Sequence, residues 1–297
     1  MVVFFVVRRR SFVGIMNILY KYCKPDGVVN ILDSLELKLP SISEVNDKFE
    51  CLPSFYCSNN FFAIKQRHLL AFKRGKRIPP TGWERKLKEK YKRGNAQKEF
   101  KETSQRLYKE WHHNKGFLLC VSKTAQNPVM WAHYANRHKG AVIGIDFDSV
   151  LRATNCVRGI KMERVKYSNK RPKLDVSIDQ FSKAWGKAFD KTILTKSDNW
   201  RYEREFRTIF IDDMLKDFEK QNLANFKELN GKKTWFLKLN SLSIKEVIFG
   251  LDTEESLKLD IRNLKGRLEL QHVKLYQASK SETYIFNLVK LTSDGKK

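Results

Sequence analysis

Cysteine is scarce in this chain: the five cysteines among 297 residues follow no spacing pattern. No pair fits Cys-x-x-Cys, which argues against a zinc ribbon and against a thioredoxin-like redox site. A disulfide framework would need more cysteines in a smaller chain, although Cys51 and Cys57 could in principle pair. We therefore expect reduced thiols and a cytoplasmic protein.

Glycine and proline are also few, at 14 and 7 residues, which excludes collagen-like and linker-like chains. No apolar run approaches the roughly 18 residues needed to span a bilayer, so we expect no membrane partner. The phosphate-loop, metalloprotease and nucleophile-elbow patterns are absent. On a helix, the adjacent His112 and His113 would point about 100° apart and would not easily chelate one ion. We expect no metal site and no permanently bound cofactor.

Acidic residues are outnumbered, because 58 Lys and Arg stand against 33 Asp and Glu and leave a net charge of +25. Such a charge indicates which partners the protein can have, and says nothing about its fold. Hydrophobic residues make up 41% of the chain, which is enough for a sizeable core and excludes a fully disordered chain. The length allows two domains or one large one.

Apolar runs and alternation predict an α+β fold with a mixed, largely antiparallel sheet and flanking helices. We expect strands at residues 35–39, 116–122, 140–147, 200–211, 235–239, 246–250, 268–275 and 283–291. We expect helices at residues 28–35, 128–135, 181–193 and 253–264.

The start of the chain is interpreted separately. Residues 1–15 place an apolar run ahead of three arginines, the reverse of a secretory signal. We interpret them as a leader, an over-extended gene start or an extra strand, since Met16 is a more natural start than Met1. Residues 16–63 and 116–292 are assigned to one catalytic-type α+β domain, and residues 64–115 to an insertion.

The insertion is strongly basic, with 17 Lys and Arg, five Glu and no Asp over residues 64–115. Its apolar residues recur at gaps of three, four and seven, which predicts a helical hairpin broken at Gly94-Asn95. Interleaved cations and aromatic rings suit phosphate contacts with some base stacking. The same aromatic residues are explained equally well as the buried face of the hairpin.

Residues 200–207, with the sequence WRYEREFR, contain two carboxylates two positions apart. On a strand, Glu203, Glu205 and Arg207 would share one face, with the carboxylates about 7 Å apart. Like charges this close raise one pKa and can form an acid–base pair. The alternative is a solvated ladder, in which Arg204, Arg207 and lysines of a neighbouring strand neutralise the two carboxylates.

Two further segments offer polar candidates. The segment MWAHY, residues 130–134, predicts a short helix on which His133 and Tyr134 are either a core pair or a ligand contact. Asn46-Asp47 is a turn signal, because both side chains can accept from backbone amides two residues on. Its residues either form a turn and a helix cap or belong to a site.

These segments together resemble the bacterial domain-of-unknown-function family numbered 2971. The family pattern contains a Tyr-Lys-Tyr strand, an Asn-Asp-Pro-Phe-Glu turn, Met-Trp-x-His-Tyr, His-x-Gly, a Lys before Trp-x-Tyr-Glu-x-Glu-aromatic-Arg, and a strand ending in Gly. This chain matches it at residues 20–22, 46–50, 130–134, 138–140, 196, 200–207 and 247–250. The resemblance covers about residues 16–275. Lys48 replaces the usual proline, and the basic stretch is extra.

The family layout is similar to that of ADP-ribosyltransferases, which implies an enzyme that acts on NAD as a substrate. A carboxylate beside the ribose would stabilise the cationic transition state, and an aromatic wall would stack the nicotinamide. We expect an ADP-ribosylating or NAD-cleaving effector of the toxin or phage-defence type. The expected catalytic residues are Glu205, Glu203 and His133, and the expected NAD contacts are Tyr20, Tyr22, Asn46, Asp47, Tyr134 and Arg207.

The alternative function is non-enzymatic binding of nucleic acid through residues 64–115. The two functions can also hold together, in an effector whose target is nucleic acid.

Overall fold

The computed structural model describes residues 18–153, 162–229 and 231–292. The expected leader, residues 1–15, lies outside this part of the chain. The contacts divide the chain into two compact units. Residues 42–116 and 166–197 form unit 1, and the other described residues form unit 2. The basic stretch, residues 64–115, lies in unit 1 together with residues 42–63 and 166–197.

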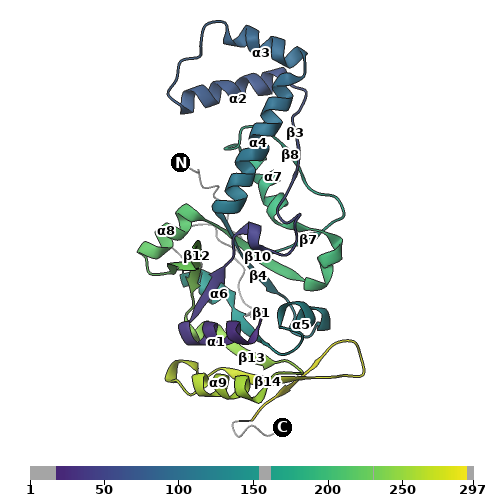
Figure 1. The fold of residues 1–297 in the computed structure, drawn as a ribbon, viewed down its shortest axis with the longest axis vertical. Helices are drawn as coiled ribbons and strands as arrows, with labels where there is room; N and C mark the ends of the chain where they lie inside the picture. Colours follow the sequence, from purple (N-terminus) through teal and green to yellow (C-terminus); the bar gives the residue numbers. More distant parts are fainter. Residues whose placement is uncertain (1–17, 154–161, 230, 293–297) are drawn as a thin grey trace. The chain divides into compact units, whose positions relative to one another are not determined.

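Unit 2 is built on an eight-stranded sheet with the order β15-β14-β13-β5-β1-β4-β10-β6 (Figure 1). The pairs around β5 and β1 are antiparallel, whereas β13 and β14 run parallel. The predicted α+β class with a mixed, largely antiparallel sheet is therefore confirmed. The strands are β1 (Ile18–Cys23), β4 (Gly116–Ser122), β5 (Ala141–Asp146), β6 (Glu163–Arg164), β10 (Glu205–Ile211), β13 (Ile244–Phe249), β14 (Lys274–Ser279) and β15 (Asn287–Lys290).

Alternation along the strands sends side chains into two separate cores, one on each face of the sheet. In β5, Ala141, Ile143 and Ile145 belong to the larger core and Val142 to the smaller one. The larger core is completed by helices α1, α6, α8 and α9, and the smaller core by α5. The helices are α1 (Pro25–Ser34), α5 (Pro128–Tyr134), α6 (Phe147–Ala153), α8 (Asp212–Lys220) and α9 (Glu255–Lys265).

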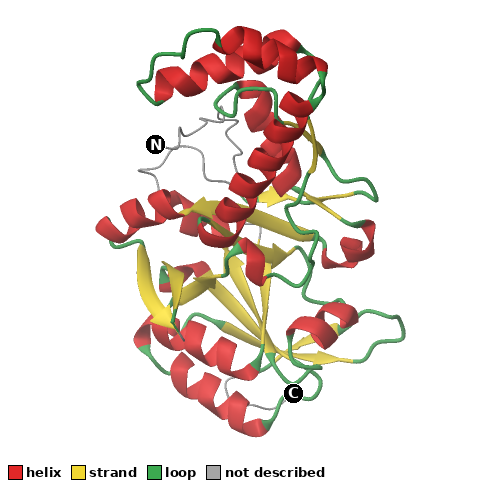
Figure 2. Ribbon diagram, turned by 45° about the horizontal axis from the view of Figure 1, so that its top comes forward, coloured by secondary structure: helices red, strands yellow, loops and turns green. Residues whose placement is uncertain are grey.

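A second sheet of unit 2 has the order β11-β12-β2, and all its pairs are antiparallel. Figure 2 shows the strands of the unit in yellow beside their helices in red. Trp235 and Leu37 from this sheet are fully buried in the larger core. The strands are β2 (Glu36–Leu39), β11 (Ala224–Leu229) and β12 (Lys232–Lys238).

Unit 1 is mostly helical. The predicted hairpin corresponds to α3 and α4, which are separated at Gly94, whose φ of 74° suits glycine. A third helix of the basic stretch, α2, was not part of that prediction. The helices are α2 (Phe61–Arg74), α3 (Trp83–Lys92), α4 (Asn95–Asn114) and α7 (Lys183–Ile193). Two short parallel pairs complete the unit: β3 (Ser54–Tyr56) with β8 (Lys173–Asp175), and β7 (Lys166–Tyr167) with β9 (Thr195–Lys196).

The aromatic residues of the basic stretch face one another. Ile64, Leu87 and Ala96 form a small buried core, and the rings of α2, α3 and α4 pack around it. Edge-on ring pairs join Phe61 to Tyr91 and Phe72 to Trp83. The interpretation of the aromatic residues as an inward face of the helices is therefore correct for Trp83, Tyr91 and Phe100. Tyr108 and Trp111 pack instead against Phe189 of α7.

Some strand boundaries were predicted wrongly. The apolar residues 268–275 were expected to form one strand, but Leu268–Leu270 form a 3₁₀ turn and β14 begins only at Lys274. Leu270 reaches the larger core from that turn and Val273 from the residue directly before β14, so their burial needs no continuous strand. Across the described part of the chain, no helix combines the length and the apolar character that a membrane crossing needs.

Candidate functional site

The expected site residues Tyr20, Tyr22 and Tyr134 lie on the α5 side of the large sheet. Tyr20, Tyr134 and Tyr202 pack against the smaller core, which contains Tyr22 and Trp131. The rings of Tyr22 and Trp131 meet edge-on with their centroids 5.5 Å apart. Residues from distant parts of the sequence therefore meet around one helix.

Helix α5 is positioned at both its start and its side. The amide of Val129 donates to Oδ1 of Asn127 at 2.9 Å, and Pro128 follows this cap at the first helical position. The side-chain amide of Asn127 also donates to the carbonyl of Tyr202 at 2.8 Å. These contacts place His133 and Tyr134, at the end of α5, beside residues 198–203.

Two predicted site residues, Tyr134 and Glu203, form a hydrogen bond. The Tyr134 hydroxyl donates to Oε1 of Glu203 at 2.5 Å, and Glu203 is buried. Such charge-assisted bonds to a carboxylate are short and strong. Nearby, Nδ1 of the exposed His133 lies 3.1 Å from the Tyr202 hydroxyl. This cluster brings together a carboxylate, two phenols and an imidazole, groups that can transfer protons.

The strand predicted over residues 200–211 is wrong in its first part. Asp198–Glu203 form a 3₁₀ turn, Arg204 has a φ of 46°, and β10 begins at Glu205. The Ser122 hydroxyl holds the turn by donating to the Glu203 carbonyl at 2.7 Å. Glu203 and Glu205 therefore do not share a strand face, and the argument for a repelling pair of carboxylates fails.

Glu205 and Arg207 form a buried ion pair on one face of β10. Arg207 donates from Nε to Oε1 at 2.9 Å and from Nη2 to Oε2 at 2.8 Å. The two residues are 4% and 1% exposed. This fork geometry is the strongest form of a carboxylate–guanidinium contact. The alternative drawn from the sequence is therefore confirmed where it pairs Glu205 with Arg207, and it is wrong in expecting a solvated ladder, because both side chains are buried.

The tyrosines of β1 place their hydroxyls against protein groups. The Tyr22 hydroxyl donates to the Thr124 carbonyl at 2.9 Å. Burial raises the pKa of Tyr22 well above its ordinary value. Burial also raises the pKa of Tyr20, and the neighbouring Glu246 raises it further. Both side chains remain protonated phenols at neutral pH.

Asn46 and Asp47 belong to unit 1. The amide of Phe49 donates to Oδ1 of Asp47 at 2.9 Å, so the predicted turn at Asp47 is confirmed. The predicted helix cap is wrong, because the next element after Asp47 is the strand β3. The turn leads to Glu50, which is buried and pairs with Lys196 at 3.2 Å. Asn46 is exposed on the same turn. Two further residues of the family pattern, Glu50 and Lys196, thus hold this loop in place.

The loop is also bonded to α4. The Tyr108 hydroxyl donates to the Cys51 carbonyl at 2.5 Å, and Nε2 of His112 lies 3.0 Å from the Glu50 carbonyl. Burial lowers the pKa of His112 below its ordinary value, so the ring is neutral at pH 7. Because a carbonyl only accepts, Nε2 carries the proton and Nδ1 is an acceptor.

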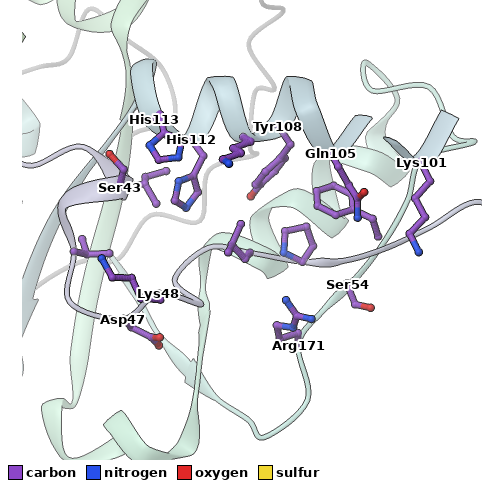
Figure 3. Close-up of a pocket in the computed structure, with 16 residues that line it drawn as sticks. Ser43, Asp47, Lys48, Ser54, Lys101, Gln105, Tyr108, His112, His113 and Arg171 are labelled. Atoms are coloured by element: carbon purple, nitrogen blue, oxygen red, sulfur yellow. The ribbon is translucent and has the colours of Figure 1, made fainter. Parts of the chain in front are cut away.

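A cavity of about 550 Å³ lies in unit 1 between this loop and α4 (Figure 3). Four cations line it: Lys48, Lys101, Lys109 and Arg171. Among the described lining residues the one carboxylate is Asp47. No ion pair joins any of the four cations to a carboxylate within the described ranges. The cavity therefore has a strongly positive lining.

The cations of the basic stretch point away from its aromatic core. Of the 17 Lys and Arg of residues 64–115, four form ion pairs among the described residues. The other thirteen form none within the same ranges, and all thirteen are exposed. The paired cations are Lys65, Arg67, Arg74 and Lys90.

Sequence reasoning missed the cavity. Lys48 was seen only as a departure from a family pattern, and His112 only as a poor metal ligand. Arg171 lies in a loop far along the chain. No periodicity connects these three segments, and only the run of cations on α4 gave a signal that could have been found.

Potential metal ligands and cysteines are scattered over the described part of the chain. No group of three or more His, Cys, Asp or Glu is placed there to hold a metal ion. Cys23, Cys51, Cys57 and Cys120 form no disulfide with one another, so Cys51 and Cys57 do not pair.

The structure is thus that of an α+β protein with two candidate sites. One is the cluster of His133, Tyr134, Tyr202 and Glu203 beside α5, and the other is the positively lined cavity of unit 1. Residues 130–208 match the model of a family described as protein of unknown function (DUF2971). The resemblance predicted from the motifs is confirmed over this segment, which includes the MWAHY and WRYEREFR sequences. No curated protein and no solved structure matches the chain.

Proposed function

We propose that unit 1 binds nucleic acid through the phosphate backbone. The observation that carries this proposal is the division of the basic stretch into an inner aromatic core and an outer layer of thirteen exposed cations without carboxylate partners among the described residues. Because the rings face inward, base stacking has a small part, and the contacts are with phosphate oxygens.

The energetics favour such binding. Each cation that neutralises a phosphate releases condensed counterions, and this release supplies most of the affinity for nucleic acid of any sequence. Lysines and arginines already paired with carboxylates release fewer ions. An unpaired layer on helices is therefore better suited to a polyanion than a surface of balanced ion pairs.

A charge-removal experiment tests the proposal with the full chain. Arg85, Lys88 and Lys92 are exposed and recur at gaps of three and four, so they share one face of α3. The triple Gln variant at these positions is titrated with a short fluorescent DNA duplex and an RNA hairpin between about 50 and 200 mM salt. We expect the slope of log K against log salt to fall by about one for each phosphate that the variant no longer neutralises.

The matched control removes three exposed cations from unit 2, as Lys232→Gln, Lys274→Gln and Lys290→Gln. Both triple variants lose the same charge, so the control should keep the wild-type slope. If the slope decreased equally in the two variants, binding would follow net charge alone, and the proposal would be overturned. So would a wild-type chain that binds neither probe.

A second candidate function is cleavage of NAD at the cluster around α5, as an ADP-ribosylating or NAD-cleaving effector of the toxin or phage-defence type. The observation that favours it is the buried carboxylate of Glu203, which accepts from Tyr134 near the exposed His133. A carboxylate in this setting can stabilise an oxocarbenium-like transition state. Glu205 is a weaker candidate, because both its oxygens accept from Arg207.

Release of nicotinamide from NAD tests this second candidate. We expect Glu203→Gln to lower turnover about a hundredfold with little change in KM, because the charge acts in the transition state. The control is Glu228→Gln, an exposed change on β11. A wild-type chain without turnover, alone or with nucleic-acid and protein acceptors, would remove the candidate. Both functions suit the cytoplasm, which we propose as the location.

A further inference from the structure

The cavity of unit 1 has an excess of positive charge in its lining, which ordinary packing of the chain does not explain. Lys48 comes from the loop, Lys101 and Lys109 from α4, and Arg171 from the segment before β8, so three chain segments bring cations to one hollow (Figure 3). Asp47, the one carboxylate in the described lining, already accepts from the amide of Phe49. Like charges that line one cavity without compensation disfavour the folded state, and a bound anion would relieve this repulsion.

The size of the cavity indicates a ligand larger than a simple anion. Its volume of about 550 Å³ lies within the range of small-molecule sites. Part of its lining is apolar or aromatic, from Leu52, Pro53, Phe55 and Tyr108. Such surfaces suit the flat face of a base or the carbon side of a sugar, whereas phosphate alone makes no use of them.

His112 offers the cavity a hydrogen-bond acceptor, whereas the four cations attract negative charge. Its Nε2–H faces the Glu50 carbonyl, and Nδ1 makes no hydrogen bond within the described ranges. The ring also lines the cavity. A neutral acceptor among four cations fits a ligand that brings its own N–H or O–H group. A sugar hydroxyl or a base amine provides one, in the same molecule as the phosphate.

We propose that this cavity is a binding site for a nucleoside monophosphate, whose phosphate is held by cations of the lining. The same chemical group occurs in a free mononucleotide and at the phosphorylated end of a nucleic-acid strand. The strand-end form rests on the proposed nucleic-acid binding of unit 1, whereas the free-nucleotide form does not. In the strand-end form, the exposed cations of the helices hold the strand and the cavity holds its terminus.

Calorimetric titration of the full chain tests the site. The probes are adenosine 5′-monophosphate, adenosine and inorganic phosphate. We expect the nucleotide to bind at least about tenfold more tightly than either part, because only the whole molecule uses both the cations and the acceptor. Phosphate binding as tight as nucleotide binding would overturn the proposal, because the site would then be one for simple anions.

The variant Lys48→Gln with Arg171→Gln removes two exposed cations from the cavity. We expect it to weaken nucleotide binding about tenfold or more. The control, Lys274→Gln with Lys290→Gln, removes the same charge from exposed positions of unit 2 outside the cavity lining and should bind the nucleotide as the wild type does. Circular dichroism checks that both variants are folded. Equal nucleotide affinity in the cavity variant and the wild type would overturn the proposal.

Binding of two oligoribonucleotides, with and without a 5′-phosphate, distinguishes a free nucleotide from a phosphorylated strand end as the ligand. It also tests the cavity separately from the proposed nucleic-acid binding of unit 1. A preference for the phosphorylated strand that the cavity variant loses supports the strand-end form. Nucleotide binding without any strand binding supports the cavity and contradicts the proposed function. Strand binding that ignores the 5′-phosphate, with no binding of the nucleotide, contradicts the cavity and leaves the proposed function standing.

Discussion

At the scale of single residues, buried charges of unit 2 are compensated by close partners. Arg207 is 1% exposed and donates twice to Glu205, while Glu203 accepts from Tyr134. A buried ion pair adds little net stability, but removing one partner leaves the other charge without compensation. The acids of the family pattern therefore act on stability, whatever else they do.

The Glu205–Arg207 pair gives the first prediction. We expect Arg207→Met to lower the free energy of unfolding by about 3–5 kcal/mol, because the buried carboxylate loses its main partner. Urea denaturation of the wild type and the variant measures the change. Arg164→Met, an exposed change on the neighbouring strand β6, should cost less than about 0.5 kcal/mol. Equal stability of the Arg207 variant and the wild type would contradict the role of the pair.

A second residue-scale prediction concerns pH. Burial lowers the pKa of both His112 and His68 in the folded state, so the unfolded chain binds their protons first as the pH falls. The free energy of unfolding should therefore decrease as the pH drops below about 6.5. Urea unfolding at several pH values measures this dependence.

The matched variants for this experiment are His112→Gln with His68→Gln, and His133→Gln as an exposed control. Glutamine at position 112 can still donate to the Glu50 carbonyl. We expect the double variant to flatten the pH dependence and the control to keep it. A wild-type stability that does not change between pH 7.5 and 5.5 would contradict the assignment.

At the scale of elements, two glycines explain why strand ends can meet. Gly250 donates from its amide to the Gly140 carbonyl at 3.1 Å, and Thr253 donates to the same carbonyl at 2.8 Å. A Cβ at Gly140 would lie 2.0 Å from the Cys23 carbonyl oxygen. A Cβ at Gly250 would lie 2.0 Å from the His138 carbonyl oxygen. Three segments of the family pattern therefore meet backbone to backbone.

This close approach gives the third prediction. We expect Gly140→Ala and Gly250→Ala each to lower the free energy of unfolding by about 3 kcal/mol, because the backbone atoms that they meet cannot move away cheaply. In Gly27→Ala, within α1, the new methyl group meets no atom closer than 3.7 Å. That control should gain about 0.5–1 kcal/mol from helix propensity. Thermal melting should place Gly27→Ala above the wild type and the other two variants below it. A melting temperature of Gly140→Ala or Gly250→Ala above that of Gly27→Ala would contradict the packing argument.

The basic stretch illustrates how an element differs from its pattern. The gaps between apolar residues predicted two helices correctly, and α3 and α4 are found on either side of Gly94. Helix α2 was missed, because its apolar residues are spread around the helix and only Ile64 is fully buried. The aromatic residues of the stretch allowed two interpretations, and the ring contacts among α2, α3 and α4 decide for packing.

At the scale of the whole molecule, charge is the dominant property. A net charge of +25 on 297 residues repels itself in the folded state. Salt screens this repulsion, with a Debye length of about 10 Å at 0.1 M. The same screening weakens contacts with a polyanion, so salt should act in opposite directions on stability and on nucleic-acid binding.

The last prediction follows from this contrast. We expect the melting temperature of the free chain to rise by about 2–4 °C when sodium chloride increases from low to moderate concentration, as repulsion is screened. Both triple Gln variants should melt higher than the wild type at low salt and respond less to added salt. Differential scanning calorimetry measures these shifts. A melting temperature that falls with salt would show that the surface ion pairs outweigh the repulsion.

Local patterns in the sequence determined much of this protein. Apolar runs such as residues 116–122 and 141–146 predicted buried strands, because a strand covered on both faces needs apolar side chains throughout. The turn at Asp47, the break at Gly94 and the excess of cations were likewise predicted correctly, since each depends on neighbouring residues alone. Alternation also placed Glu205 and Arg207 on one face of β10.

Tertiary structure decided what those residues do. The partner of Glu203 is Tyr134, on a different segment, and the turn that ends at Glu203 is held by Ser122 of β4. The cavity of unit 1 arises only where residues 42–55, α4 and Arg171 come together. Sequence spacing sets which side chains share a face of one element, but burial, pairing and cavities depend on which elements meet. Which elements meet is decided by the packing of the whole chain.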